Sequence, residues 1–171
     1  ACTKLAPGCG VVGGDLAASE KVMISVAAHG SLEGREPVLR SGAQVGDLVA
    51  VAGTLGRAAA GLALLQSGNT DAISAYDELV NVQRRPNPPI KAGVAAAEAG
   101  ATAMLDLSDG LAKDATRIAK ASGVTLQLDP LQLQGFEAVL EEAAMAIDFD
   151  AKIWVIGGGE DHSLLATFPS D

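Results

Sequence analysis

Ala-Met-Leu-Asp-Leu-Ser-Asp-Gly-Leu, residues 103–111, is the stretch of sequence that decides the predicted fold. Residues 103–107 form a short apolar run interrupted by one carboxylate, which predicts a buried strand. The turn-forming residues 108–110 follow, and the apolar spacing of residues 111–121 then predicts a helix. Ser108 is the expected N-cap of that helix. A strand that passes through a short turn into a helix is therefore the unit around which the remaining elements are placed.

Outward from this unit, short β-rich runs predict further strands, and Ala- and Leu-rich runs predict further helices. The expected strands span 11–15, 21–28, 47–52, 124–128 and 162–168, and the expected helices span 57–66, 71–82, 90–99 and 136–145, with a short helix starting at Asp129-Pro130. Residues 151–156 fit a strand or a helix by pattern alone. Because strands and helices do not alternate strictly, we predict an α+β fold with a mixed sheet packed with helices.

Turn residues and charges fill the segment 30–46, which predicts a domain boundary. We assign residues 1–35 to the end of one domain and residues 36–171 to a second. The sequence begins at Ala1 without a methionine and stops directly after a predicted strand. We therefore expect a fragment whose second domain is incomplete at its C-terminus.

The composition excludes several classes of protein. Hydrophobic residues make up 49% of the 171 residues and aromatic residues only 3%, so the core is expected to consist of Ala, Val, Leu and Ile. The net charge of −9 argues against a nucleic-acid partner. No apolar run reaches the roughly 18 residues of a membrane span. The two cysteines, Cys2 and Cys9, suit reduced thiols in the cytoplasm rather than a zinc site.

An acidic chain that binds phosphate needs a cation, helix N-termini or backbone amides to do so. Asp106 and Asp109 lie on either side of the turn after the predicted strand, so their carboxylates can converge on one cation. Mg²⁺ is satisfied by one or two carboxylates together with substrate phosphates. The alternative is an ordinary helix start with acidic residues at the positive end of the helix dipole. Asp114, one turn further on, is expected to be a solvated surface residue.

Two glycine-rich segments end in acidic residues. Gly13-Gly14-Asp15 suits either a phosphate and metal contact or a tight turn. Gly157-Gly158-Gly159-Glu160-Asp161 suits either a ligand contact or a β-bulge before the next strand. Arg40 suits either a phosphate contact or an exposed loop position. The sequence contains neither the P-loop pattern nor the dinucleotide-binding glycine pattern.

In chain order, five motifs together resemble those of bacterial thiamine-monophosphate kinases, which belong to the superfamily of aminoimidazole ribonucleotide synthetase. They are Gly13-Gly14-Asp15, Leu39-Arg40-Ser41-Gly42-Ala43 with Val45-Gly46-Asp47, Arg85-Pro86 with Pro88-Pro89, Asp106-Leu107-Ser108-Asp109-Gly110-Leu111, and Gly158-Gly159-Glu160-Asp161. The resemblance covers nearly the whole chain. It implies the C-terminal α+β domain of that superfamily, preceded by the tail of an N-terminal domain for ATP binding and dimerisation. It also implies that residues 148–156 are helical.

The resemblance implies ATP- and Mg²⁺-dependent phosphorylation of thiamine monophosphate to thiamine diphosphate in a cytoplasmic homodimer, with no membrane partner. Carried over by position, Asp15, Asp106 and Asp109 would hold Mg²⁺. Gly14, Asp15, Arg40 and Ser108 would contact ATP, and Glu160 would contact the thiamine moiety. No side chain is assigned a covalent catalytic role, because phosphoryl transfer depends mainly on positioning and charge stabilisation.

Two departures from the family pattern carry expectations of their own. Leu16 stands where the family usually has threonine, so a hydroxyl contact there is lost. The family's N-terminal segment and C-terminal end have no counterpart, so we expect this chain alone to bind Mg-ATP weakly and to lack substantial kinase activity. Two alternatives remain open: another member of the superfamily, such as aminoimidazole ribonucleotide synthetase, and a non-catalytic binding or assembly module.

Overall fold

The computed structural model describes residue 6 and residues 8–170. Its contacts divide the chain into two units, with the boundary along the sequence between Pro37 and Val38. Among its described residues, the first unit contains turns and bends but no helix or strand. The strands expected at 11–15 and 21–28 are therefore wrong for this structure. Val12 is 105% exposed and Val22 is 94% exposed, because these runs have no apolar surface to pack against and no partner strand. Cys9 is exposed, and Cys2 lies outside the described residues.

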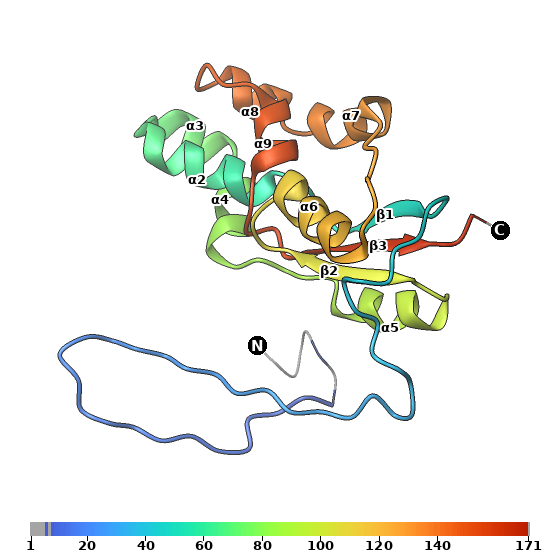
Figure 1. The fold of residues 1–171 in the computed structure, drawn as a ribbon. Helices are drawn as coiled ribbons and strands as arrows, with labels where there is room; N and C mark the ends of the chain where they lie inside the picture. The colour runs from blue at the N-terminus through green and yellow to red at the C-terminus, as the bar shows by residue number, and fades with distance from the viewer. Residues whose placement is uncertain (1–5, 7, 171) are drawn as a thin grey trace. The chain divides into compact units, whose positions relative to one another are not determined.

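The second unit contains three strands and eight helices among its described residues (Figure 1). In chain order they are β1 (Leu48–Ala52), α2 (Arg57–Ser67), α3 (Thr70–Ala75), α4 (Asp77–Arg84), α5 (Ile90–Glu98), β2 (Ala103–Leu107), α6 (Leu111–Ser122), α7 (Pro130–Ala138), α8 (Glu141–Met145), α9 (Ala151–Gly157) and β3 (Ser163–Phe168). The α+β class predicted from the sequence is confirmed. None of the described helices is both long enough and apolar enough to span a bilayer.

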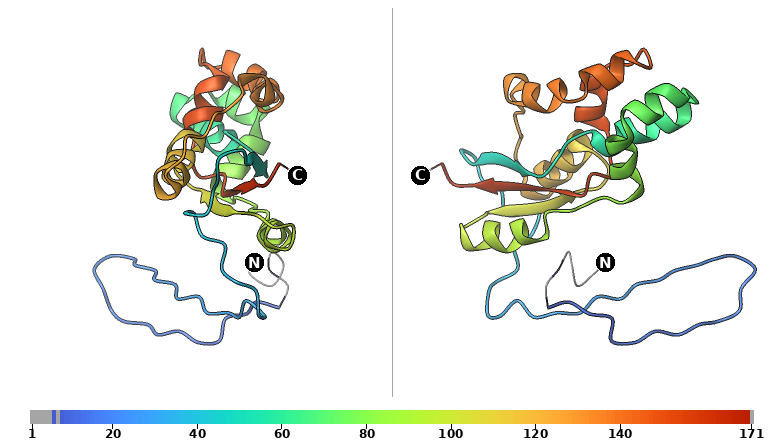
Figure 2. Two further views of the ribbon diagram at one scale, coloured as in Figure 1. Left: turned by 45° about the vertical axis from the view of Figure 1, so that its right-hand side comes forward. Right: turned by 180° about the vertical axis from the view of Figure 1, so that it is seen from behind.

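The three strands form one antiparallel sheet in the order β1-β3-β2. Figures 1 and 2 show α5 on one face of this sheet and the other helices of the unit on the opposite face. Successive side chains of a strand point to opposite faces. Leu165 accordingly joins the main core, whereas Leu164 and Ala166 pack on the α5 side. Trp154 of α9 is buried in the main core and stacks on Phe149, with ring centroids 4.9 Å apart.

Several predicted elements have different bounds in the structure. The helix expected over 71–82 is interrupted at Tyr76, whose φ of −117° and ψ of 39° separate α3 from α4. The helix expected over 136–145 is divided into α7 and α8. Residues 124–128 alternate as predicted, and Val124, Leu126 and Leu128 pack on the core. They are not a strand, however, because no described strand pairs with them.

The ambiguous segment 151–156 lies in helix α9. The carboxylate of Asp150 accepts a hydrogen bond from the Lys152 amide at 2.9 Å and caps the first turn. An aspartate at this position satisfies one of the amides that a helix start leaves free. The helix that the family resemblance implied over 148–156 is confirmed for residues 151–156, whereas residues 148–150 precede it.

Helices α2 and α4 approach each other closely at one glycine. A Cβ atom at Gly61 would lie 2.1 Å from the carbonyl oxygen of Leu79 and 2.6 Å from its carbonyl carbon. Both atoms belong to the backbone of α4, so no side-chain movement could make room. The absence of a side chain at Gly61 therefore sets the distance between the two helices.

Candidate active site at the ends of β2 and β3

Two loops meet at one end of the sheet because β2 and β3 are antiparallel neighbours. Leu107, the last residue of β2, lies opposite Ser163, the first residue of β3. The loop after β2, residues 108–110, therefore lies beside the loop before β3, residues 158–162. The Glu160 amide donates a hydrogen bond to the Ser108 carbonyl at 2.9 Å, and the His162 amide donates to the Leu107 carbonyl at 3.1 Å.

Glycines allow the backbones of these loops to touch. A Cβ atom at Gly159 would lie 2.4 Å from the Ser108 carbonyl oxygen, and one at Gly110 would lie 2.6 Å from the Gly157 carbonyl oxygen. Gly110 also has a φ of +108°, which side chains rarely tolerate. The glycine run before Glu160 thus serves the close approach of one loop of the chain to the other.

Three polar side chains lie together here, Asp106 from the end of β2 and Glu160 and His162 from the second loop. The His162 Nδ1 atom lies 3.9 Å from Asp106 Oδ2, and its Nε2 atom lies 3.6 Å from Glu160 Oε2. The side chains of Asp106 and Glu160 are 62% and 63% exposed, so both carboxylates remain open to a ligand. Glu160 and His162 have φ values of +71° and +51°, which are uncommon for residues other than glycine. His162 was not predicted from the sequence to belong to this cluster.

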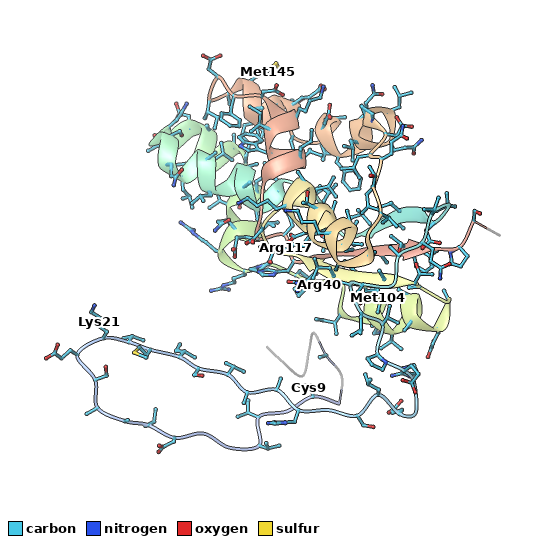
Figure 3. All side chains as sticks on the ribbon, viewed as in Figure 1. Cys9, Lys21, Arg40, Met104, Arg117 and Met145 are labelled. Carbon is cyan, nitrogen blue, oxygen red and sulfur yellow. The ribbon has the colours of Figure 1, made fainter. Side chains whose placement is uncertain are left out.

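Asp109 forms an ion pair with Arg117 of α6, whose guanidinium also contacts Asp114. Figure 3 labels Arg117 on this helix. The hydrogen bond and the charge of Arg117 hold the pKa of Asp109 below its ordinary value, so Asp109 stays ionised. The carboxylate also remains 44% exposed on its side chain, and can therefore meet a ligand as well as Arg117.

Asp114 is fully buried, which contradicts its expected place on a solvated surface. One of its carboxylate oxygens accepts a hydrogen bond from the Asp109 amide at 3.0 Å, and the other pairs with Arg117. Asp114 follows Leu111 by three residues and precedes Ile118 by four, so it lies on the buried stripe of α6. This helical spacing in the sequence could have predicted that Asp114 is buried. Its role is to fix the backbone of the loop that carries Asp109.

Ser108 is not the N-cap of α6, contrary to the sequence prediction. The N-cap position is Gly110, and no side chain there caps the helix. The helix begins at Leu111 as predicted, but the residue directly before it is Gly110, whose positive φ allows it to pack on the 157–158 backbone. Ser108 instead contributes its carbonyl, which holds the second loop in place.

Asp161, in the second loop, is 5% exposed, and its carboxylate lies beside Thr54 and the first amides of α2. Its Oδ1 atom accepts a hydrogen bond from the Thr54 hydroxyl at 2.7 Å, whereas Oδ2 has no partner among the described residues. Burial raises the pKa of the Asp161 carboxyl, and the Thr54 hydroxyl and the first amides of α2 partly oppose this effect. Asp161 therefore connects the second loop to the start of α2, although the burial of its carboxylate disfavours the ionised form.

Replacing Asp161 by asparagine should change how the free energy of unfolding depends on pH. The folded pKa of Asp161 lies above its ordinary value of 3.8, so the folded state binds more protons between the two values. The contribution of Asp161 to the free energy of unfolding therefore decreases as the pH rises through that interval. Urea denaturation at a series of pH values measures this effect. As the pH rises, the free energy of unfolding of the wild type should fall relative to that of Asp161→Asn and should then become constant. A relative free energy that rises with pH would contradict this assignment.

The structure brings together four of the predicted site residues: Asp106, Ser108, Asp109 and Glu160. Arg40 is exposed and lies elsewhere, since its carbonyl accepts a hydrogen bond from the Ser122 hydroxyl at 3.1 Å. Ser122 ends α6, whereas the loops lie at its beginning, about 18 Å away for a helix of 12 residues.

The other two predicted positions, Gly14 and Asp15, lie in the first unit. The Asp15 carboxylate accepts a hydrogen bond from the adjacent Leu16 amide at 2.9 Å, as in a local turn. Within residues 8–170, no three His, Cys, Asp or Glu side chains are grouped closely enough to hold a metal ion by themselves. The second unit thus offers the two carboxylates of Asp106 and Asp109, and a ligand would complete any cation site there.

Comparison with known proteins identifies the family of the chain. Residues 44–159 match the family described as AIR synthase related protein, C-terminal domain. The chain is 48% identical over 161 residues to a thiamine-monophosphate kinase of Mycobacterium tuberculosis, covering 94% of this chain and 47% of that protein. It is 40% identical over 159 residues to a thiamine-monophosphate kinase of Corynebacterium glutamicum, covering 92% and 48%. The chain thus spans about half the length of the curated relatives it matches.

Solved structures agree with the sequence matches. Thiamine monophosphate kinase from Aquifex aeolicus superposes with a TM-score of 0.63 at 32% identity, covering 78% of this chain and 44% of that one. A structure of AaThiL complexed with AMPPCP and TMP also gives a TM-score of 0.63 at 32% identity, covering 77% and 42%. The chain therefore belongs to the AIR synthase related family, and the relatives that it matches are thiamine-monophosphate kinases.

Proposed function

We propose that this chain forms part of an ATP- and Mg²⁺-dependent kinase that transfers a phosphoryl group from ATP to thiamine monophosphate, giving thiamine diphosphate. The observation that carries the proposal is the exposed acidic cluster on two interlocked loops, in a chain whose relatives have this activity by name. A relative complexed with AMPPCP, an ATP analogue, and TMP supports both substrates. A homodimer and a cytoplasmic location stay predictions from the family resemblance.

The donor set suits Mg²⁺, which takes oxygen ligands and is commonly held by one or two carboxylates together with substrate phosphates. Asp106 and Asp109 would hold the ion in this unit, and Asp15 stays a Mg²⁺ ligand predicted from the family resemblance. When bound, the ion would neutralise charge on the phosphates and position them for in-line displacement. Arg117 and the buried Asp114 keep Asp109 ionised and fix its backbone, so this ligand is oriented before any substrate arrives.

The remaining residues of the cluster have separate proposed roles. Glu160 is held on the second loop by its own amide and faces His162, so its carboxylate can meet the cationic part of thiamine monophosphate. Gly14, Arg40 and Ser108 are the proposed contacts of ATP. Arg40 lies at the far end of α6 from the loops, so in this proposal it binds a part of the nucleotide distant from the transferred phosphate.

The direct test measures thiamine diphosphate formed from ATP, Mg²⁺ and thiamine monophosphate by the whole gene product. We expect activity in the wild type and a loss of about 10²–10³-fold in kcat for Asp106→Asn and Asp109→Asn, because each variant removes charge from the phosphate site. Asp129→Asn is the matched control, since Asp129 caps α7 outside the cluster and asparagine caps equally well. It should retain wild-type activity.

Other outcomes would identify the alternatives. Turnover of formylglycinamidine ribonucleotide without turnover of thiamine monophosphate would indicate a different acceptor within the family. Calorimetric binding of Mg²⁺ and ATP that is the same in wild type, Asp106→Asn and Asp109→Asn, without turnover, would indicate a binding module. The chain of residues 1–171 alone is expected to bind Mg-ATP weakly and to show no substantial turnover.

A further inference from the structure

We propose that Arg117 is the counter-cation of Asp109 when no Mg²⁺ is bound, and that Mg²⁺ has to displace its guanidinium from this carboxylate in order to bind there. Arg117 would thus set how strongly the acidic cluster binds Mg²⁺ before any substrate arrives. The inference rests on the proposed role of Asp109 as a Mg²⁺ ligand. It goes beyond that role, because it assigns to Arg117 a part in the entry of the metal.

The two proposed Mg²⁺ ligands of this unit differ in their partners. The side chain of Asp106 is 62% exposed, and its contact with His162 Nδ1 measures 3.9 Å, which is longer than a hydrogen bond. The Oδ2 atom of Asp109, in contrast, accepts a hydrogen bond from Nη2 of Arg117. A cation that binds Asp109 must therefore break or share an existing ion pair.

The Arg117 guanidinium is held at its other end by a buried partner. Its Nη1 atom donates a hydrogen bond to Oδ1 of Asp114, whose side chain is fully buried. Removing one partner from a buried carboxylate leaves an uncompensated charge and is strongly destabilising. The contact with Asp114 is therefore the permanent one, and it keeps Arg117 beside the cluster even when Asp109 binds another cation.

The contact of Arg117 with Asp109 is the weaker of the two. The side chains of Arg117 and Asp109 are 42% and 44% exposed, so water screens their attraction. A divalent ion at about 2.1 Å from a carboxylate oxygen attracts it more strongly than a monovalent guanidinium at hydrogen-bond distance does. Mg²⁺ can therefore replace Nη2 at the Asp109 carboxylate while Nη1 remains on Asp114.

The shape of the guanidinium suits this exchange. Its two Nη atoms belong to one planar group with five N–H donors, so the group can release one carboxylate and keep the other. The backbone of the loop is fixed separately, because the Asp109 amide donates a hydrogen bond to Oδ2 of Asp114 at 3.0 Å. Loss of the contact between Arg117 and Asp109 therefore leaves Asp109 at its position in the loop.

A purely orienting role for Arg117 predicts the opposite effect on metal binding. If the ion pair only orients the Asp109 carboxylate, loss of the pair makes this ligand more mobile and lowers the affinity for Mg²⁺. If Arg117 competes with Mg²⁺ for the carboxylate, loss of the pair raises that affinity. The direction of the change in affinity therefore distinguishes the two roles.

The test uses the double variant Asp114→Asn/Arg117→Gln of the whole gene product. The variant removes one negative and one positive charge, so the net charge is unchanged. An asparagine side chain can still accept the hydrogen bond from the Asp109 amide, and the neutral pair leaves no buried charge without a partner. Calorimetry with Mg²⁺ alone, without nucleotide, should show binding about two- to fivefold tighter than in the wild type, the equivalent of an exposed ion pair.

The control repeats the comparison on the Asp109→Asn background. Because the carboxylate that Arg117 contacts is then missing, the double change should leave the affinity for Mg²⁺ unaltered. Weaker or equal binding by the double variant overturns the inference, as does the same increase on the Asp109→Asn background. Absence of Mg²⁺ binding in both the wild type and the double variant overturns it as well.

A measurement on the unaltered Asp114 and Arg117 covers the possibility that the double variant does not fold. In protein labelled with ¹⁵N-arginine, Mg²⁺ should shift an arginine side-chain resonance in the wild type, and that resonance should not respond in Asp109→Asn. If no arginine resonance behaves in this way, the inference is wrong. None of these measurements needs turnover. A wild type that binds Mg²⁺ but does not phosphorylate thiamine monophosphate would contradict the proposed function, and the Mg²⁺ affinities would still decide the role of Arg117.

Discussion

Gly61→Val is expected to destabilise the second unit by about 3 kcal/mol or more, at the upper end of the cost of overpacking a core. The first added atom alone would lie 2.1 Å from the Leu79 carbonyl oxygen, and the two further methyl groups of valine enlarge the conflict. Since the obstacle is the backbone of α4, relief requires the two helices to separate. Separation would expose the apolar contacts around Leu64 and Val80.

Urea denaturation followed by circular dichroism measures this effect, and Gly93→Val is the matched control. Both changes place the same side chain at a glycine inside a helix, but the position of Gly93 is open. The control should therefore remain within about 1 kcal/mol of the wild type, the range of intrinsic helix propensities. Equal denaturation midpoints for the two variants would show that α2 and α4 are not in backbone contact at Gly61.

Gly159→Ala is expected to lower kcat/KM of the whole gene product for thiamine monophosphate by about 100-fold, the effect of a displacement of about 1 Å in a catalytic arrangement. The added methyl group would lie 2.4 Å from the Ser108 carbonyl oxygen and 3.2 Å from the Asp109 Cα atom. It therefore forces apart the two loops that carry Asp109 and Glu160, although it removes no functional group.

Gly157→Ala is the control for that variant, because it makes the same change two residues earlier in the same glycine run. A Cβ atom at Gly157 would meet nothing within 4 Å, so activity should be unchanged. Calorimetry with Mg²⁺ and ATP separates geometry from loss of fold, since Gly159→Ala should weaken binding while its circular dichroism stays native. Full activity in Gly159→Ala would show that the approach of the two loops is not needed for function.

The sequence predicted well those elements that carry their own boundary signals. The strand at 103–107 and the helix that follows it were found because turn residues separate them and Gly123 ends the helix. The β-rich run at 21–28 failed for the opposite reason. A strand is stabilised by its neighbours, and the described residues of the first unit provide none. The break between α3 and α4 at Tyr76 could not be predicted, because no glycine or proline marks it in the sequence.

The site shows a similar division. Asp106, Asp109 and Glu160 were identified because acidic residues beside glycines are conspicuous in a sequence. Their joining depends on the pairing of β2 with β3, which no local pattern specifies. Asp114 could have been recognised as buried from the helical spacing of its apolar neighbours. His162 could not have been placed between two carboxylates, because its position depends on a positive φ that the sequence does not reveal.

The order of the sheet also has a consequence for how the protein is made. The central strand, β3, is the last of the three to leave the ribosome, and β1 and β2 form their sheet hydrogen bonds with β3 rather than with each other. During synthesis, β1 and β2 therefore remain unpaired until residues 163–168 emerge. Such long-range pairing slows folding and leaves strand edges exposed. Because Glu160 and His162 immediately precede β3, one late event completes both the sheet and the acidic cluster.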